Sequence, residues 1–392
     1  MRDSPLDRVV GLTARNEELR TQYRLAVAAR TVRRQAEWVP LQRLRPELES
    51  PERRRRERAW RVANARRLED APELSELWRS LVEIQAEPAS RTGEPDAGRR
   101  VQLAIEEFVT SVLVRLHERR RRQLGLRTIR PWDLCTVPPG FPVEPLFATK
   151  RYAIVAADRA MSDVHYRVGA GLTAPYASAD ALESDAEVED VLADYGEALV
   201  QATMPDIARS GREADVVARV ALPLLVLHGT EAAHDEANAP TPLKRVRIRH
   251  LERRLLGWTF GAMIDAFEEW AYSHPDQVQD ENVPGTIWSS LWLRFLPAVD
   301  WAGLEDVLNV DWQRHDALFL RPGESVNRIS RELEVLKAWN HATDLGAWFQ
   351  ELGITDHAAA HHFPGATAIV DQDLLEVARW MEDTIEDLEG AI

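Results

Sequence analysis

Residues 119–134 read RRRRQLGLRTIRPWDL, and this stretch decides how the chain is organised. The residues before it, from Arg99 to Glu118, place apolar side chains at helical spacing and predict one long helix. Gly125 predicts the end of that helix, because glycine readily adopts the left-handed conformation that commonly follows the last turn. The stretch that begins at Arg130, RPWDLCTVPPGFPVEP, is rich in proline and predicts an irregular crossing. The stretch therefore predicts a long helix that leads into an irregular crossing.

Helical patterns also dominate on both sides of this stretch. They run through most of the chain before residue 88 and return from Asp185 almost to the end. PASRTGEPDAG (88–98) is a break, and RYAIVAA (151–157) is the run with enough β-forming residues to suggest a strand. The predicted fold class is therefore mainly α, with at most a small β element near 151–157.

The composition indicates a two-lobed globular protein. The chain has 392 residues, 45% of them hydrophobic, which is enough for two lobes. We expect an N-terminal helical lobe over residues 1–130 and a second helical lobe over 131–392. A single cysteine, Cys135, excludes an internal disulfide and cysteine-based zinc clusters. Because neither a signal peptide nor a membrane-length apolar run is evident, we expect a cytoplasmic protein.

The charge balance and the motifs exclude several classes of function. A net charge of -15 repels nucleic acid and anionic membranes, so neither is expected as a partner. The arginine runs at 53–58 and 119–123 lie on helical patterns beside acidic residues and are interpreted as solvated helix faces. The sequence contains neither GxSxG nor GxxxxGK[ST], which excludes a nucleophile elbow and a phosphate-binding loop of those types.

Three blocks in order resemble the oligoendopeptidase F branch of the thimet-oligopeptidase family of helical zinc peptidases. The family's long helix ends in R-x-x-LG and is followed by LRPWDL, which Arg120, Leu124, Gly125 and residues 130–134 match. Residues 250–276 are similar to the family segment ending in DAFQHWxYxHP, and residues 294–339 follow its VDWxGLE and the pattern after it. The resemblance implies a two-lobed helical peptidase-like shell around a central channel, with residues 131–392 as its peptidase-like lobe.

The positions that carry the family's chemistry are changed in this sequence. By the resemblance, the histidine that stabilises the transition state falls at Ala317, and His315 lies two residues early. The substrate-facing tyrosines fall at Glu324, Ser325 and Arg328, which makes these three the candidate peptide-binding residues.

The zinc motif H-E-x-x-H is also absent. HGTEAAH (228–234) places His228 and His234 six apart, a helical rotation of about 240°, so both cannot face one ion on a helix. Glu231 is displaced from the position of a general base. In a second register the zinc helix lies within 187–210, which contains no histidine. Both registers lack at least two ligands.

A second histidine group lies near the C-terminus. His357 and His361 are four apart and can share a helical face, yet no glutamate is placed beside them as a base. His228, Glu231, His234, His357 and His361 are therefore the weak metal candidates, and no catalytic residue is assigned.

The sequence thus predicts a catalytically inactive pseudo-peptidase that binds a peptide or protein partner and needs no cofactor. One alternative is an active zinc metalloendopeptidase, or a repurposed enzyme on the same scaffold, with zinc as its cofactor. A second alternative is a structural or assembly protein.

Overall fold

The structure is a computed structural model of the chain. It describes residues 14–26, 72–86, 97–134, 241–280, 282–315, 324–341 and 371–390, with isolated positions between 55 and 68 and at 220, 224 and 318. Within these ranges the chain is mainly helical and forms no strand, which confirms the predicted fold class. The predicted β element at 151–157 lies outside the described residues. None of the described helices combines the length and apolarity needed to cross a membrane.

The chain divides into two compact units that interleave in the sequence. The first comprises Met1–Thr136 and Gly257–Val326, and the second comprises Val137–Leu256 and Asn327–Ile392. Each unit consists of two segments that are separated in the sequence. A single boundary near residue 130 would instead give two continuous lobes. The lobes 1–130 and 131–392 remain a prediction.

The long helix predicted to end near Gly125 is confirmed. It consists of α5 (Ala97–Phe108), a π-helical turn η4 (Val109–Leu113) and α6 (Val114–Gln123), and Gly125 follows with a φ of 64°. The hydroxyl of Ser111 donates to the carbonyl of Glu107 at 2.7 Å. This bond provides a partner for a carbonyl beside the π turn, where the regular helical ladder is interrupted.

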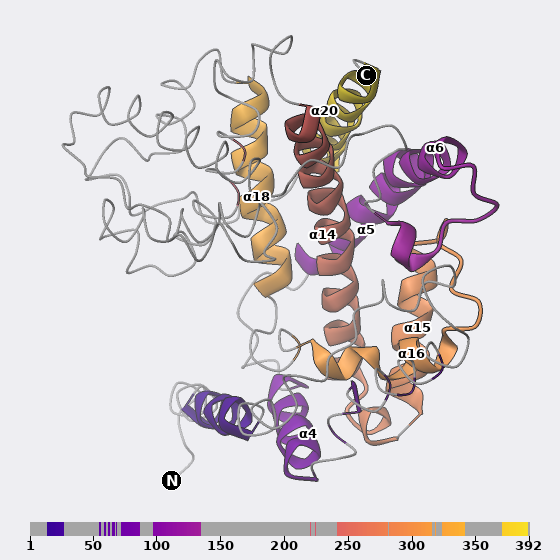
Figure 1. Cartoon of the computed structure of the whole chain (residues 1–392). Helices are drawn as coiled ribbons and strands as arrows, with labels where there is room; N and C mark the ends of the chain where they lie inside the picture. The colour runs from indigo at the N-terminus through magenta and orange to yellow at the C-terminus, as the bar shows by residue number, and fades with distance from the viewer. Residues whose placement is uncertain are drawn as a thin grey trace, which may run out of the picture. The chain divides into compact units, whose positions relative to one another are not determined.

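Most of the other long described helices lie in the second half of the chain. Figure 1 shows α14 as one long helix, with α15 and α16 beside each other below α6. In chain order, the helices that Figure 1 labels besides α5 and α6 are α4 (Pro72–Ala86), α14 (Thr241–Ser273), α15 (Val283–Phe295), α16 (Glu305–Asp311), α18 (Glu324–His341) and α20 (Asp371–Gly390). These bounds agree with the helical periodicity that the sequence shows from Asp185 onwards.

The contact between α15 and α16 depends on a glycine. A Cβ atom at Gly285 would lie 2.4 Å from the backbone oxygen of Asn309, so a larger residue cannot fit unless a helix moves. One turn further along α15, the hydroxyl of Ser289 donates to the side-chain oxygen of Asn309 at 2.7 Å. The close packing of α15 on α16 at Gly285 therefore brings Ser289 and Asn309 into contact.

Aromatic side chains fill the core of the first unit. Phe267 on α14 lies 5.2 Å from Trp288 and 5.4 Å from Trp312, measured between ring centroids, and Trp292 lies 4.7 Å from Trp301. Trp288, Trp301 and Trp312 are buried. Tilted and edge-to-face contacts at such distances stabilise a core beyond the burial of their area. Trp288, Trp301 and Trp312 therefore belong to the core of this unit.

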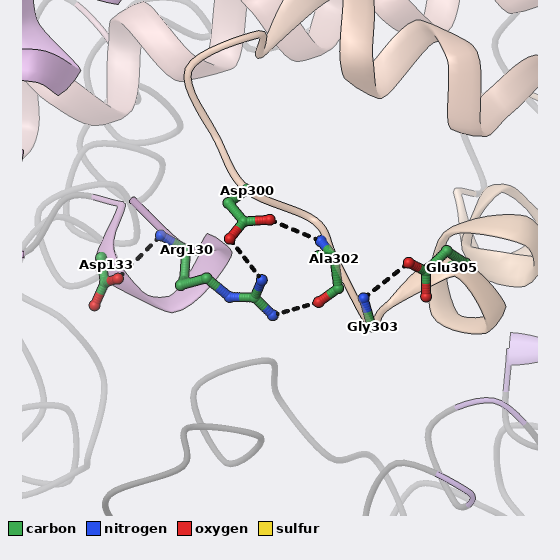
Figure 2. A network of polar contacts seen from close by, with 6 residues as sticks. All are labelled: Arg130, Asp133, Asp300, Ala302, Gly303 and Glu305. Atoms are coloured by element: carbon green, nitrogen blue, oxygen red, sulfur yellow. Dashed lines mark hydrogen bonds and ion pairs between the residues drawn. The ribbon is translucent and has the colours of Figure 1, made fainter. Parts of the chain in front are cut away.

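A polar network joins the RPWDL segment to the VDWAGLE turn (Figure 2). The guanidinium of Arg130 pairs with Asp300 at 3.2 Å and donates to the carbonyl of Ala302 at 2.8 Å. The carboxylate of Asp133 accepts a bond from the backbone N–H of Arg130 at 3.0 Å. Beside this network, Ile129 and Val299 form an isolated parallel bridge. These bonds thus connect two segments that are distant in the sequence.

The same network holds Asp300 in its charged form. The backbone N–H of Ala302 donates to the Asp300 carboxylate at 2.9 Å, and this bond is the main reason why the pKa of Asp300 lies below its usual value. Arg130 lowers the pKa further. Gly303 follows with a φ of 77°, a conformation that favours glycine, and its N–H donates to Glu305 at 2.8 Å. The segment is therefore a tightly bonded turn.

Candidate functional site

The three candidate peptide-binding residues lie at the start of α18. Glu324 is half-buried, Ser325 is buried and Arg328 has 46% of its side chain exposed. A peptide that reached this part of α18 would therefore meet the guanidinium of Arg328 more readily than the hydroxyl of Ser325. The sequence predicted the three residues together, and the structure distinguishes them by exposure.

Within the second unit, Arg328 lies beside a buried carboxylate. Oε1 of Glu332 lies 3.7 Å from Nε of Arg328 and 3.4 Å from Nη1 of Arg254 on α14. Because Glu332 is buried, two cations beside it offset the cost of removing its charge from water. The contact to Arg328 joins Nε to the carboxylate and is longer than a hydrogen bond.

This arrangement suits recognition of a carboxylate. An arginine presents its donors in a planar fork that matches the two oxygens of a carboxylate, and such pairs are stronger than neutral hydrogen bonds. The carboxylate of Glu332 lies beside Nε of Arg328, and 46% of the Arg328 side chain is exposed to solvent. Glu332 and Arg254 were not among the predicted site residues. Their pairing joins two separate helices, which a sequence pattern does not reveal.

A second polar cluster lies in the first unit, between α5 and α14. The side-chain amide of Gln102 donates to Asp265 at 2.8 Å and to Glu269 at 3.1 Å. Removal from water raises the pKa of Asp265 to about 6; the bond from Gln102 opposes the rise, and the nearby charge of Glu269 adds to it. Glu106, one turn along α5 from Gln102, pairs with Arg294 of α15. The cluster can therefore hold a proton close to neutral pH.

Only part of this cluster can be predicted from the sequence. Asp265 and Glu269 are four apart in the segment that resembles DAFQHWxYxHP, and such a spacing brings two carboxylates together on a helix. Gln102, the group that bridges them, comes from a distant helix, and only the packing of α5 on α14 supplies it.

His315 is a component of the aromatic core. Its ring lies 4.7 Å from Phe260 and 5.2 Å from Trp288, measured between centroids, and its Nε2 lies 3.1 Å from the carboxylate of Asp311. Arg314 donates to the other oxygen of Asp311 at 3.0 Å. These contacts fix the imidazole within the fold of the first unit. Ala317, the position that the resemblance assigns to the catalytic histidine, lies outside the described residues.

The weak metal candidates also lie outside the described residues. These are His228, Glu231, His234, His357 and His361. In the part of the chain that the structure describes, histidine, cysteine and acidic side chains form no group of three suited to a metal ion. The sequence contains no H-E-x-x-H run.

The arrangement of the helices defines a peptidase-like fold. The structure is similar to that of PZ peptidase A with inhibitor 2, with a TM-score of 0.66 and 14% identity over 98% of this chain and 78% of that chain. It is also similar to "putative Oligoendopeptidase F", with a TM-score of 0.53 and 16% identity over 99% of this chain and 76% of that chain. At these identities the likeness establishes the fold.

The sequence comparisons give no match. No protein-family model matches the chain. No curated protein matches it either. The expectation of a helical peptidase-like shell is confirmed at the level of fold.

Proposed function

We propose that this chain binds a peptide or protein partner on a peptidase-like scaffold and does not hydrolyse peptide bonds by zinc chemistry. The observation that carries the proposal is the combination of a peptidase-like fold over 98% of the chain with a sequence that lacks H-E-x-x-H. That motif supplies two zinc ligands and the glutamate that activates water. We therefore infer that the scaffold binds a peptide without the groups that this motif supplies for cleavage.

Arg328 is the residue that we assign to ligand binding, with Glu324 and Ser325 beside it on α18. Its side chain is 46% exposed, and its Nε lies 3.7 Å from Oε1 of Glu332. The group it suits is a carboxylate, such as the C-terminus of a peptide. The net charge of -15 favours a ligand that is otherwise basic, through long-range attraction.

Two labelled peptides test this assignment. Both consist of alternating arginine and leucine and carry fluorescein at the N-terminus; one ends in a free carboxylate and the other in an amide. Fluorescence anisotropy is expected to show tighter binding of the free acid. Replacement Arg328→Gln is expected to weaken binding of the free acid by about tenfold, corresponding to about 1.4 kcal/mol, and to leave binding of the amide almost unchanged.

Lys337 provides a matched control on the same helix. It is 44% exposed, close to Arg328, and is nine residues further along α18, which is about half a turn away from the face of Arg328. Lys337→Gln removes the same charge and is expected to leave both affinities unchanged. Equal losses for the two variants would show that only net charge matters and would refute the assignment of Arg328.

Cleavage is measured in the same experiment. After incubation of each peptide with the chain and added Zn²⁺, mass spectrometry is expected to find the peptides intact. Cleavage that a chelator abolishes would overturn the proposed function and would support the active metalloendopeptidase.

A further inference from the structure

Helix α5 leaves to solvent a stripe with a leucine at its centre. Leu103 is 53% exposed, and Arg99 and Glu107, one turn before and one turn after it, are also exposed. Residues four apart on a helix advance by only about 40° around its axis, so the three side chains lie along one line. Val101 and Ile105 on the other side of α5 are buried. The stripe is therefore the surface that α5 presents outwards.

The charges on this stripe are complementary to those of a second copy of the stripe in antiparallel orientation. Arg99 stands four residues before Leu103 and Glu107 stands four residues after it. If a second copy of α5 is placed antiparallel, with the twofold axis at Leu103, each Arg99 faces the Glu107 of the other copy. A contact about a twofold axis requires this kind of self-complementarity. Leu103 would then meet Leu103 at the centre.

A second exposed leucine belongs to the helix next to α5. Leu293 on α15 is 58% exposed and precedes Arg294, which pairs with Glu106 of α5. Among the described residues, large apolar side chains are exposed at three positions, and two of them are on these two joined helices. The Glu106–Arg294 pair links the helices that carry these two leucines.

We propose that the α5 stripe, formed by Arg99, Leu103 and Glu107, is a contact between two copies of this chain, packed antiparallel about a twofold axis. This inference is independent of the proposed peptide binding. Because the stripe is narrow, the interface is smaller than that of an obligate dimer, and self-association is expected to be weak and transient. Its charge pairs are exposed, so the association is expected to weaken at high salt.

Charge reversal tests the antiparallel register. Sedimentation velocity of the full chain is expected to show a monomer–dimer equilibrium. Arg99→Glu alone sets two carboxylates opposite each other and Glu107→Arg alone sets two guanidinium groups opposite each other, so each variant is expected to be mainly monomeric. An equal mixture of the two variants pairs opposite charges again and is expected to restore the dimer. The double variant in one chain is expected to restore it as well.

An exposed leucine elsewhere in the first unit provides the control for the apolar contact. Leu25, on the helix over residues 14–26, is 67% exposed. Leu103→Glu is expected to abolish the dimer and Leu25→Glu to leave it unchanged, with circular dichroism verifying that both variants fold. A wild-type chain that stays monomeric at its highest soluble concentration would overturn the proposal. A mixture of charge variants that fails to dimerise would overturn it too.

Discussion

Arg130 and Asp300 join two segments that are far apart in the sequence, with 3.2 Å between Nη1 and Oδ2 (Figure 2). The same guanidinium bonds the carbonyl of Ala302 at 2.8 Å. Arg130 thus contacts a side chain and the backbone of the turn that precedes α16. The residues of RPWDL and VDWAGLE that carry the sequence resemblance are, in this structure, residues that hold the first unit together.

Replacement of Arg130 by alanine is expected to destabilise the chain by about 1–3 kcal/mol, because it removes a charge-assisted bond to a carbonyl together with an ion pair. Arg15→Ala is the control. Arg15 pairs with Glu18 at 2.7 Å on an exposed helix surface, and loss of such a pair costs about 0–1 kcal/mol. Urea unfolding of both variants measures the difference. Equal stabilities would show that Arg130 does not connect the two segments.

Gly285→Ala is expected to destabilise the chain by about 1–3 kcal/mol, since its methyl group would lie 2.4 Å from the backbone oxygen of Asn309. Gly257→Ala is the matched control within a helix. No atom lies within 4 Å of a Cβ placed at Gly257, and alanine there is expected to stabilise α14 by about 0.5–1 kcal/mol. Thermal unfolding should move in opposite directions for the two variants. A neutral effect at Gly285 would mean that α15 and α16 are further apart.

Asp265 is expected to destabilise the chain as the pH rises. Its pKa is about 6 in the folded chain, whereas the ordinary pKa of an aspartate side chain is 3.8, so the folded chain binds the proton more tightly than the unfolded chain does. The stability it contributes is present at low pH and is lost as the pH rises through about 6. Asp265→Asn should therefore be more stable than wild type at pH 7.5, by up to about 2–3 kcal/mol, and similar to it near pH 4. Urea midpoints at both pH values measure this; a constant difference would contradict the raised pKa.

His117 is expected to destabilise the chain as the pH falls, which is opposite to the effect of Asp265. Burial, and then the charge of Arg120, lower the pKa of His117 to about 4 from 6.5, so the unfolded chain binds the proton more tightly. The stability it contributes is present above about pH 6.5 and is lost as the pH falls towards 4. His117→Gln should remove this loss, and the remaining effect of Asp265 should then make that variant more stable at pH 4.5 than at pH 6.5. A variant that still loses stability on acidification would refute this account of His117.

Local features of the chain could be predicted from the sequence. The end of the long helix at Gly125 and the helices of the second half follow from apolar spacing and from the left-handed conformation at one glycine, which depend on neighbouring residues only. The peptidase-like fold could be predicted as well, because three ordered blocks resemble a known family.

The candidate site could be predicted only in part. The sequence placed Glu324, Ser325 and Arg328 together, but their different exposures depend on which face of α18 is covered. Helical spacing restricts a residue to a face and does not say what covers that face. The proposed role of Arg328 therefore needed the packing as well as the pattern.

By itself, the sequence determined the helical fold class, the peptidase-like order of the blocks and the absence of the zinc motif. Only the tertiary structure decided which distant side chains meet: Gln102 with Asp265, Arg254 with Glu332, and Arg130 with Asp300. The physical reason is that helices form from local propensity and apolar spacing, whereas contacts between helices depend on how whole surfaces pack, and each surface combines residues from distant parts of the chain.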